Sequence, residues 1–172
     1  MSASAPATHR GRARIIVPSF IARAQRNHGR HGAVAVPVPA AAHIMKIFRG
    51  SDSPFQQADA RSFTGTAETR LLGSSDEGTP AHIYEVVFEP GARTNWHRHT
   101  GPQWLLVIEG RIRIQCENGT AEDLDEGDAV VIAPGERHWH GATPGGRGAH
   151  FAVNVRATTE WLEPVSDEDY SR

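Results

Sequence analysis

Residues 96–120 read WHRHTGPQWLLVIEGRIRIQCENGT, and the expected fold follows from this stretch. Within it, residues 104–109 (WLLVIE) are apolar up to the final Glu109, which is typical of a buried strand. Residues 111–117 alternate between polar and apolar side chains, so the apolar ones share one face of a strand. Asn118 and Gly119 follow directly and form the strongest short signal of a hairpin turn. The stretch therefore predicts antiparallel strands joined by tight turns.

Further strand candidates lie on both sides of this stretch. They are AHIYEVVFE (residues 81–89), AVVIA (residues 129–133) and AHFAVNV (residues 149–155). Strands recur about every 10–20 residues, and turns rich in Gly and Pro separate them, which predicts an all-β barrel or sandwich. We expect residues 158–170 to form one short helix or an extended arm.

The composition limits the possible partners. The chain has 172 residues, of which 38% are hydrophobic, enough for one domain with a core. Residues 44–172 hold all 20 acidic residues against 12 Lys and Arg, so they would repel a phosphate backbone, and we expect no nucleic-acid partner. No apolar run reaches the length of a membrane span, so we expect no membrane partner. Cys116 is the only cysteine, and nothing points to an oxidising compartment, so we expect a cytoplasmic protein.

The first 44 residues differ from the rest, and we place the folded domain at residues 45–172. Residues 1–43 carry six Arg and no acidic residue, and they show little periodicity. Such a segment cannot bury enough apolar surface to offset its ordering entropy. Three interpretations stay open: a disordered basic extension, an organelle transit peptide, and an extension from a misassigned start codon with Met45 as the true beginning.

Two His-x-His pairs carry the strongest chemical signal, His97 with His99 and His138 with His140. On a strand, the period of two places both imidazoles of a pair on one face, so they can converge on one point. Imidazole is the commonest protein ligand for borderline divalent metals. One such pair arises readily by chance, but two pairs, each introduced by a Gly-rich turn, favour a metal site.

The spacing around these pairs resembles that of the cupin family. Residues 91–110 follow the pattern G-x5-H-x-H-x3-Q-x6-G of the first cupin motif, and residues 127–138 resemble the second. The resemblance covers roughly residues 83–155, and both motifs agree in spacing and order. It implies a cupin jelly-roll barrel (a double-stranded β-helix) with one divalent metal inside its mouth. The implied metal ligands are His97, His99, Gln103 and His138.

Gln103 departs from the commoner cupin pattern, in which Glu occupies this position. Its amide oxygen is still a fair ligand for Mn, Fe, Zn or Co, although a surface polar role is the alternative. With four neutral ligands the ion would keep its full charge, which favours Lewis-acid chemistry.

Residues 127–142 resemble a narrower group, the small single-barrel cupins that include the Mn-dependent bacterial hydroxynitrile lyases. Those proteins use three His and one Gln on the metal, and the resemblance implies Mn first, with Fe, Zn, Co and Ni as alternatives. By this resemblance the catalytic residues are His140, His150 and Asn154, the last standing where the group has Gln. His140 and His150 would act as general base and acid, and the alternative is that they are buried core histidines.

Three functions fit this set of residues. The first is a metal-dependent lyase that cleaves a carbon–carbon bond in a small carbonyl or hydroxy substrate. The second is an Fe-dependent cupin dioxygenase, and the third is a binding module for a small molecule without catalysis. We expect a small-molecule substrate as the partner and a homo-oligomer, either a dimer or a tetramer.

Overall fold

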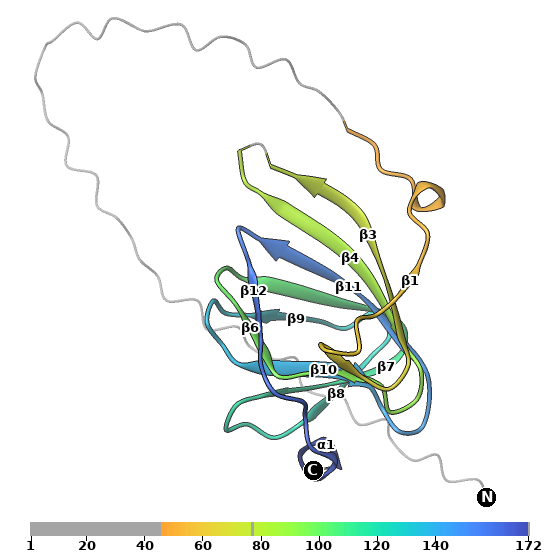
Figure 1. Cartoon of the computed structure of the whole chain (residues 1–172), viewed down its shortest axis with the longest axis vertical. Helices are drawn as coiled ribbons and strands as arrows, with labels where there is room; N and C mark the ends of the chain where they lie inside the picture. The colour runs from red at the N-terminus through yellow and green to blue at the C-terminus, as the bar shows by residue number, and fades with distance from the viewer. Residues whose placement is uncertain (1–45, 77, 172) are drawn as a thin grey trace, which may run out of the picture. The chain divides into compact units, whose positions relative to one another are not determined.

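The computed structural model describes residues 46–76 and 78–171, so the extension expected at residues 1–44 lies outside the described residues. The described part is a curled sheet of twelve strands with very little helix (Figure 1). The elements are η1 (Gly50–Asp52), β1 (Gln56–Gln57), β2 (Phe63–Thr64), β3 (Ala67–Ser75), β4 (Ala81–Phe88), β5 (Arg93–Thr94), β6 (His97–His99), β7 (Gln103–Cys116), β8 (Glu122–Asp125), β9 (Ala129–Ile132), β10 (His138–Ala142), β11 (Gly148–Val155), β12 (Thr159–Trp161) and α1 (Asp167–Ser171).

The strands form two antiparallel layers that share the long strand β7. One layer runs β1-β3-β4-β11-β7 and continues to β9. In the other layer β7 pairs with β10 and β8, and β10 pairs with β5 and β6. The layers enclose a common interior, so the predicted all-β jelly-roll barrel is confirmed (Figure 1). Within the described residues, no helix is long and apolar enough to cross a membrane.

Strand β7 serves both layers because it bends at Gly110, whose φ is 65°. A Cβ at this position would lie 2.2 Å from the carbonyl oxygen of Arg147, so the backbone approach requires a residue without a side chain. The sequence predicted separate strands over residues 104–109 and 111–117. They are instead two halves of one bent strand.

The core lies between the two layers, where the strands alternate between inward and outward side chains. Phe88, Leu105 and Ile112 point inward and are fully buried. Removing a side chain of this size from water contributes about 1.5–3 kcal/mol. On the same strand as Leu105, Trp104 and Leu106 point outward and are 51% and 42% exposed, so the run predicted as a buried strand is buried on one face only.

The C-terminal helix α1 packs against the end of the barrel, which confirms the short helix that the sequence predicted as one of two possibilities. Buried Arg93 donates hydrogen bonds to the carboxylate of Asp167 at 2.7 Å and to the carbonyl of Val165 at 2.9 Å. The hydroxyl of Tyr170 donates to the carbonyl of Ala142 at 2.6 Å. These contacts join the chain end to β5 and β10, two strands that surround the interior.

Candidate metal centre

The two His-x-His pairs lie on neighbouring strands, β6 and β10. His97 lies directly opposite His138 in the antiparallel pairing, and each is followed two residues later by a second buried histidine, His99 or His140. The ring centroids of His97 and His138 are 4.2 Å apart, and those of His97 and His99 are 5.1 Å apart. The structure therefore brings together all four rings that the sequence singled out.

Backbone carbonyls orient two of these rings. Nδ1 of His97 lies 2.9 Å from the carbonyl oxygen of Asn95, and Nδ1 of His138 lies 2.9 Å from that of Glu136. A carbonyl oxygen can only accept, so Nδ1 carries the proton and Nε2 of the neutral ring keeps its lone pair. This is how proteins orient histidines that ligate metals.

His99 and His140 each present a ring nitrogen that no described residue satisfies. Nδ1 of His99 lies 3.0 Å from the hydroxyl of Thr159, and its Nε2 is buried without a hydrogen-bond partner among the described residues. Nε2 of His140 is also buried without a hydrogen-bond partner among the described residues. Buried polar atoms rarely stay unpaired, so both atoms indicate a group that belongs in this space.

Burial keeps the cluster neutral. It lowers the pKa of His97 and His140 well below the usual value, and it also lowers the pKa of His138. It lowers the pKa of His99 and of His150 to about 4. The charge that His138 would carry further opposes protonation of His97 and His99. Since metals bind neutral imidazole, the protonation state suits an ion.

Gln103 supplies an oxygen donor beside these nitrogens. Its Oε1 lies 3.0 Å from Nε2 of His138, and its Nε2 donates to Oδ1 of Asn154 at 3.0 Å. Because Nδ1 of His138 holds the ring proton, the lone pair of Nε2 faces a lone pair of the amide oxygen, and a cation stabilises that arrangement. Two donors bound side by side to one octahedral ion at about 2.1 Å also lie about 3 Å apart. The residues present therefore fit a divalent metal.

One three-His group is compact enough to hold an ion directly. The ligand nitrogens of His97, His138 and His140 lie within 4.8 Å of one another, and all three residues are buried. His140 thus joins the group, although the sequence predicted a catalytic role for it. His99 and Gln103 lie at the side of this group, where Gln103 contacts His138.

His140 and His150 form a second feature deeper in the barrel. Nε2 of His150 lies 3.0 Å from Nδ1 of His140, and both rings are buried. The backbone N–H of His140 donates to the hydroxyl of Thr94, and the ring of Phe88 lies 5.6 Å from that of His150. Nδ1 of His150 has no partner in the described part of the chain. A pair of neutral rings in direct contact can pass a proton between them.

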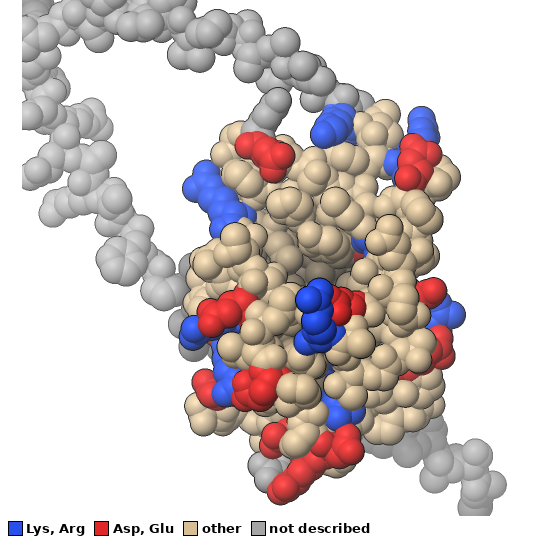
Figure 2. Space-filling view, viewed as in Figure 1, with Lys and Arg blue, Asp and Glu red and all other residues tan. Residues whose placement is uncertain are grey.

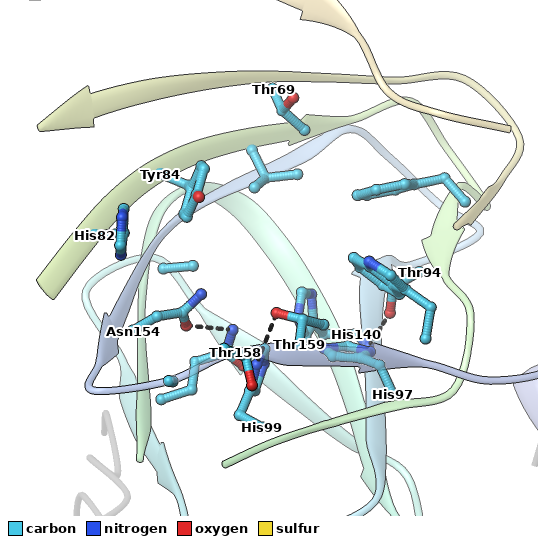
Figure 3. A pocket seen from close by; sticks show the side chains of 16 residues that line it. Thr69, His82, Tyr84, Thr94, His97, His99, His140, Asn154, Thr158 and Thr159 are labelled. Atoms are coloured by element: carbon cyan, nitrogen blue, oxygen red, sulfur yellow. Dashed lines mark hydrogen bonds between the residues drawn. The ribbon is translucent and has the colours of Figure 1, made fainter. Parts of the chain in front are cut away.

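A pocket of about 410 Å³ leads to these residues. Aromatic and aliphatic side chains line part of it, and threonine hydroxyls and the polar side chains of the site line the rest. In Figure 3, His97, His99 and His140 lie at its base, while His82 and Tyr84 lie higher on its wall. Figure 2 shows the hollow in this face, with mostly uncharged residues around it.

The comparisons with known proteins agree with the fold and the site. The cupin domain family matches residues 84–153. The chain belongs to the cupin family. It is 38% identical over 131 residues to (R)-mandelonitrile lyase of Granulicella tundricola, a match that covers 74% of this chain and 100% of that protein.

Two solved structures show the same fold. A cupin-like protein from Thermotoga maritima superposes with a TM-score of 0.63 and 37% identity, over 67% of this chain and 90% of that one. The polyketide cyclase RemF from Streptomyces resistomycificus superposes with a TM-score of 0.58 over 74% of this chain and 92% of that one. Its identity of 20% makes it evidence for the fold alone.

Proposed function

We propose that this cupin is a metal-dependent lyase that cleaves a hydroxynitrile into a carbonyl compound and hydrogen cyanide. The observation that carries the proposal is the contact of 3.0 Å between His150 and His140, which is itself one of the three histidines of the compact cluster. The identity of 38% to (R)-mandelonitrile lyase supports the same reaction class.

The proposed ligands are His97, His99, Gln103 and His138, and the proposed ion is Mn. When bound, a divalent ion supplies Lewis acidity toward a substrate oxygen. The ligand set is neutral, because a glutamine replaces a carboxylate and the imidazoles have lowered pKa values. Nothing in this set reduces the positive charge available to the substrate.

In the proposed reaction, histidines of the protein accept the proton of the substrate and return it to the leaving group. Nε2 of His140, buried and unpartnered among the described residues, takes the proton of the substrate hydroxyl. The oxygen then forms a carbonyl with its carbon, and the bond to the nitrile carbon breaks with its electron pair on cyanide. Cyanide takes up one proton from the His140 and His150 pair, which restores both rings. Atoms and charge balance without an oxidant or reductant.

The pocket walls suit a substrate with one aromatic ring. Phe63 and Trp161 lie with ring centroids 5.7 Å apart, and both line the pocket. Val86 and Ala152 add aliphatic surface. A space of about 410 Å³ is in the usual range for small-ligand sites, which are mostly apolar with a few placed polar groups. Mandelonitrile is therefore the first substrate to test.

The test is release of benzaldehyde and cyanide from mandelonitrile by protein loaded in turn with Mn, Fe, Zn and Co. We expect activity that persists without oxygen and is lost in His140→Ala with the metal still bound. A fully loaded protein without lyase activity would refute the proposal. Oxygen-dependent turnover would favour the dioxygenase instead. The homo-oligomer and the cytoplasmic location stay predictions.

A further inference from the structure

We infer that Asn154 is a positioning residue that fixes which atom Gln103 presents to the metal-binding imidazoles. The inference rests on the metal site of the proposed function. It assigns Asn154 a contact with a ligand rather than with the substrate. The physical basis is the two-sided nature of an amide, which has an oxygen that can bind a metal and an NH2 group that cannot.

The strand register places Asn154 next to Gln103. Asn154 on β11 lies directly opposite Gln103 on β7, so both side chains leave the same face of the sheet toward the interior. Side chains opposite each other in an antiparallel pair start about 4.5–5.5 Å apart, which is within reach of two amides. Gln103 is 3% exposed and Asn154 is 9% exposed, so water does not easily replace either partner.

The orientation follows from hydrogen bonding. Oε1 of Gln103 lies 3.0 Å from Nε2 of His138, which leaves the NH2 group on the side of Asn154. A buried NH2 group needs an acceptor, and Oδ1 of Asn154 accepts from it at 3.0 Å (Figure 3). Without this acceptor, turning the oxygen toward the ion would leave a buried donor unpaired. Asn154 therefore lowers the cost of the orientation that binds metal.

The chain offers a matched set of variants. Asn154→Leu removes the acceptor at similar volume, whereas Asn154→Asp keeps an oxygen that can only accept. No described residue accepts a hydrogen bond from the Asn154 amide nitrogen, so the aspartate breaks no other hydrogen bond of this side chain. Val153→Ala, on the other face of the same strand, controls for small packing changes.

The experiment measures Mn and Co affinity by competition with a chelator, together with the visible spectrum of the Co-loaded protein. We expect Asn154→Leu to weaken binding about tenfold or more and to change the Co spectrum, as loss of a residue that orients a ligand does. Asn154→Asp should bind at least as tightly as the original chain, because its carboxylate still accepts from Gln103 and adds a negative charge close to the ion. The double variant Gln103→Leu with Asn154→Leu should bind no more weakly than Gln103→Leu alone, because the effect of Asn154 acts through Gln103.

The outcomes separate this inference from the proposed function. If Asn154→Leu binds both metals as tightly as the original chain while Gln103→Leu binds weakly, the positioning role is wrong and the metal site stands. If His97→Ala and His138→Ala leave binding unchanged, the metal site itself is wrong. If Asn154→Leu melts early, Asn154→Ala replaces it with the same expected loss, and an unaffected affinity there overturns the inference.

Discussion

The hydroxyl of Thr159 lies 3.0 Å from Nδ1 of His99, and the two residues, on β12 and β6, lie directly opposite each other. The contact joins a histidine of the candidate metal centre to a strand near the end of the chain. It leaves Nε2 of His99 facing the buried interior. The C-terminal strand is therefore part of what orients the candidate site.

Replacing Thr159 with Val tests that contact. The variant keeps the branched shape and loses the hydroxyl, so the His99 ring is free to rotate. We expect about tenfold weaker Mn binding, the usual scale for losing a group that orients a metal ligand. Thr159→Ser keeps the hydroxyl and should retain affinity in the same titration. Equal affinity in all three proteins would show that His99 needs no such support or does not bind the ion.

Single alanine variants distinguish the two possible ligand sets. The set expected from the sequence includes His99, whereas the compact three-His group contains His140 instead. We expect His99→Ala to lose most metal affinity, and His140→Ala to retain the metal but lose turnover. The opposite result would place the ion deeper in the barrel, on His97, His138 and His140. Metal content by elemental analysis and a turnover assay on the same samples provide both measurements.

Gly110→Ala tests the bend that lets β7 join both layers. A Cβ there would lie 2.2 Å from the carbonyl oxygen of Arg147, on a backbone with φ of 65°. We expect the free energy of unfolding to fall by about 2–4 kcal/mol, since the side chain adds both strain and a clash. Gly145→Ala is the control, because a Cβ at Gly145 would meet nothing within 4 Å. Equal free energies of unfolding for the two variants, measured by urea titration, would mean that the bend tolerates a side chain.

Cys116 gives a prediction that depends on pH. Burial, and next the hydrogen bond and charge of Glu136, raise the pKa of this thiol from 9.0 to about 11. The thiolate is the reactive form, so the folded protein at pH 8 should react with iodoacetamide about a hundredfold more slowly than an ordinary thiol. The rate should rise as pH approaches 11 and should be fast at any of these pH values in urea. Fast labelling of the folded chain at pH 8 would contradict the assigned pKa.

The parts that the sequence predicted well are those set by local pattern. The two His-x-His pairs needed only the period of two and the antiparallel pairing of β6 with β10 to converge. The exposure of Trp104 was harder to predict, because an apolar run does not reveal which face of the strand meets a core. This residue is 51% exposed. Thr159 had no local signal at all, since its role arises from pairing with a strand 60 residues away. The candidate ligands could be predicted from the sequence, while the groups that orient them depend on the fold.

Gln103→Glu separates the two enzyme hypotheses. The substitution keeps the size and the oxygen donor, and it adds a negative charge 3.0 Å from the position of Nε2 of His138. The far carboxylate oxygen would then face Oδ1 of Asn154, so that amide must turn and donate instead of accept. A charged ligand binds a divalent ion more tightly, but it also reduces the positive charge that the substrate hydroxyl experiences.

We therefore expect Gln103→Glu to raise Mn affinity and to slow cleavage of mandelonitrile, with the rate recovering only at higher pH because the substrate hydroxyl loses its proton less readily. A dioxygenase predicts a different outcome, since added electron density at Fe does not hinder electron transfer to oxygen. Gln103→Leu, which removes the oxygen donor, should lower affinity and serves as the matched control. The measurements are chelator competition and the pH dependence of turnover for the three proteins. Identical affinity and identical pH profiles in all of them would show that Gln103 does not contact the ion, and the Lewis-acid proposal would then lose its neutral oxygen ligand.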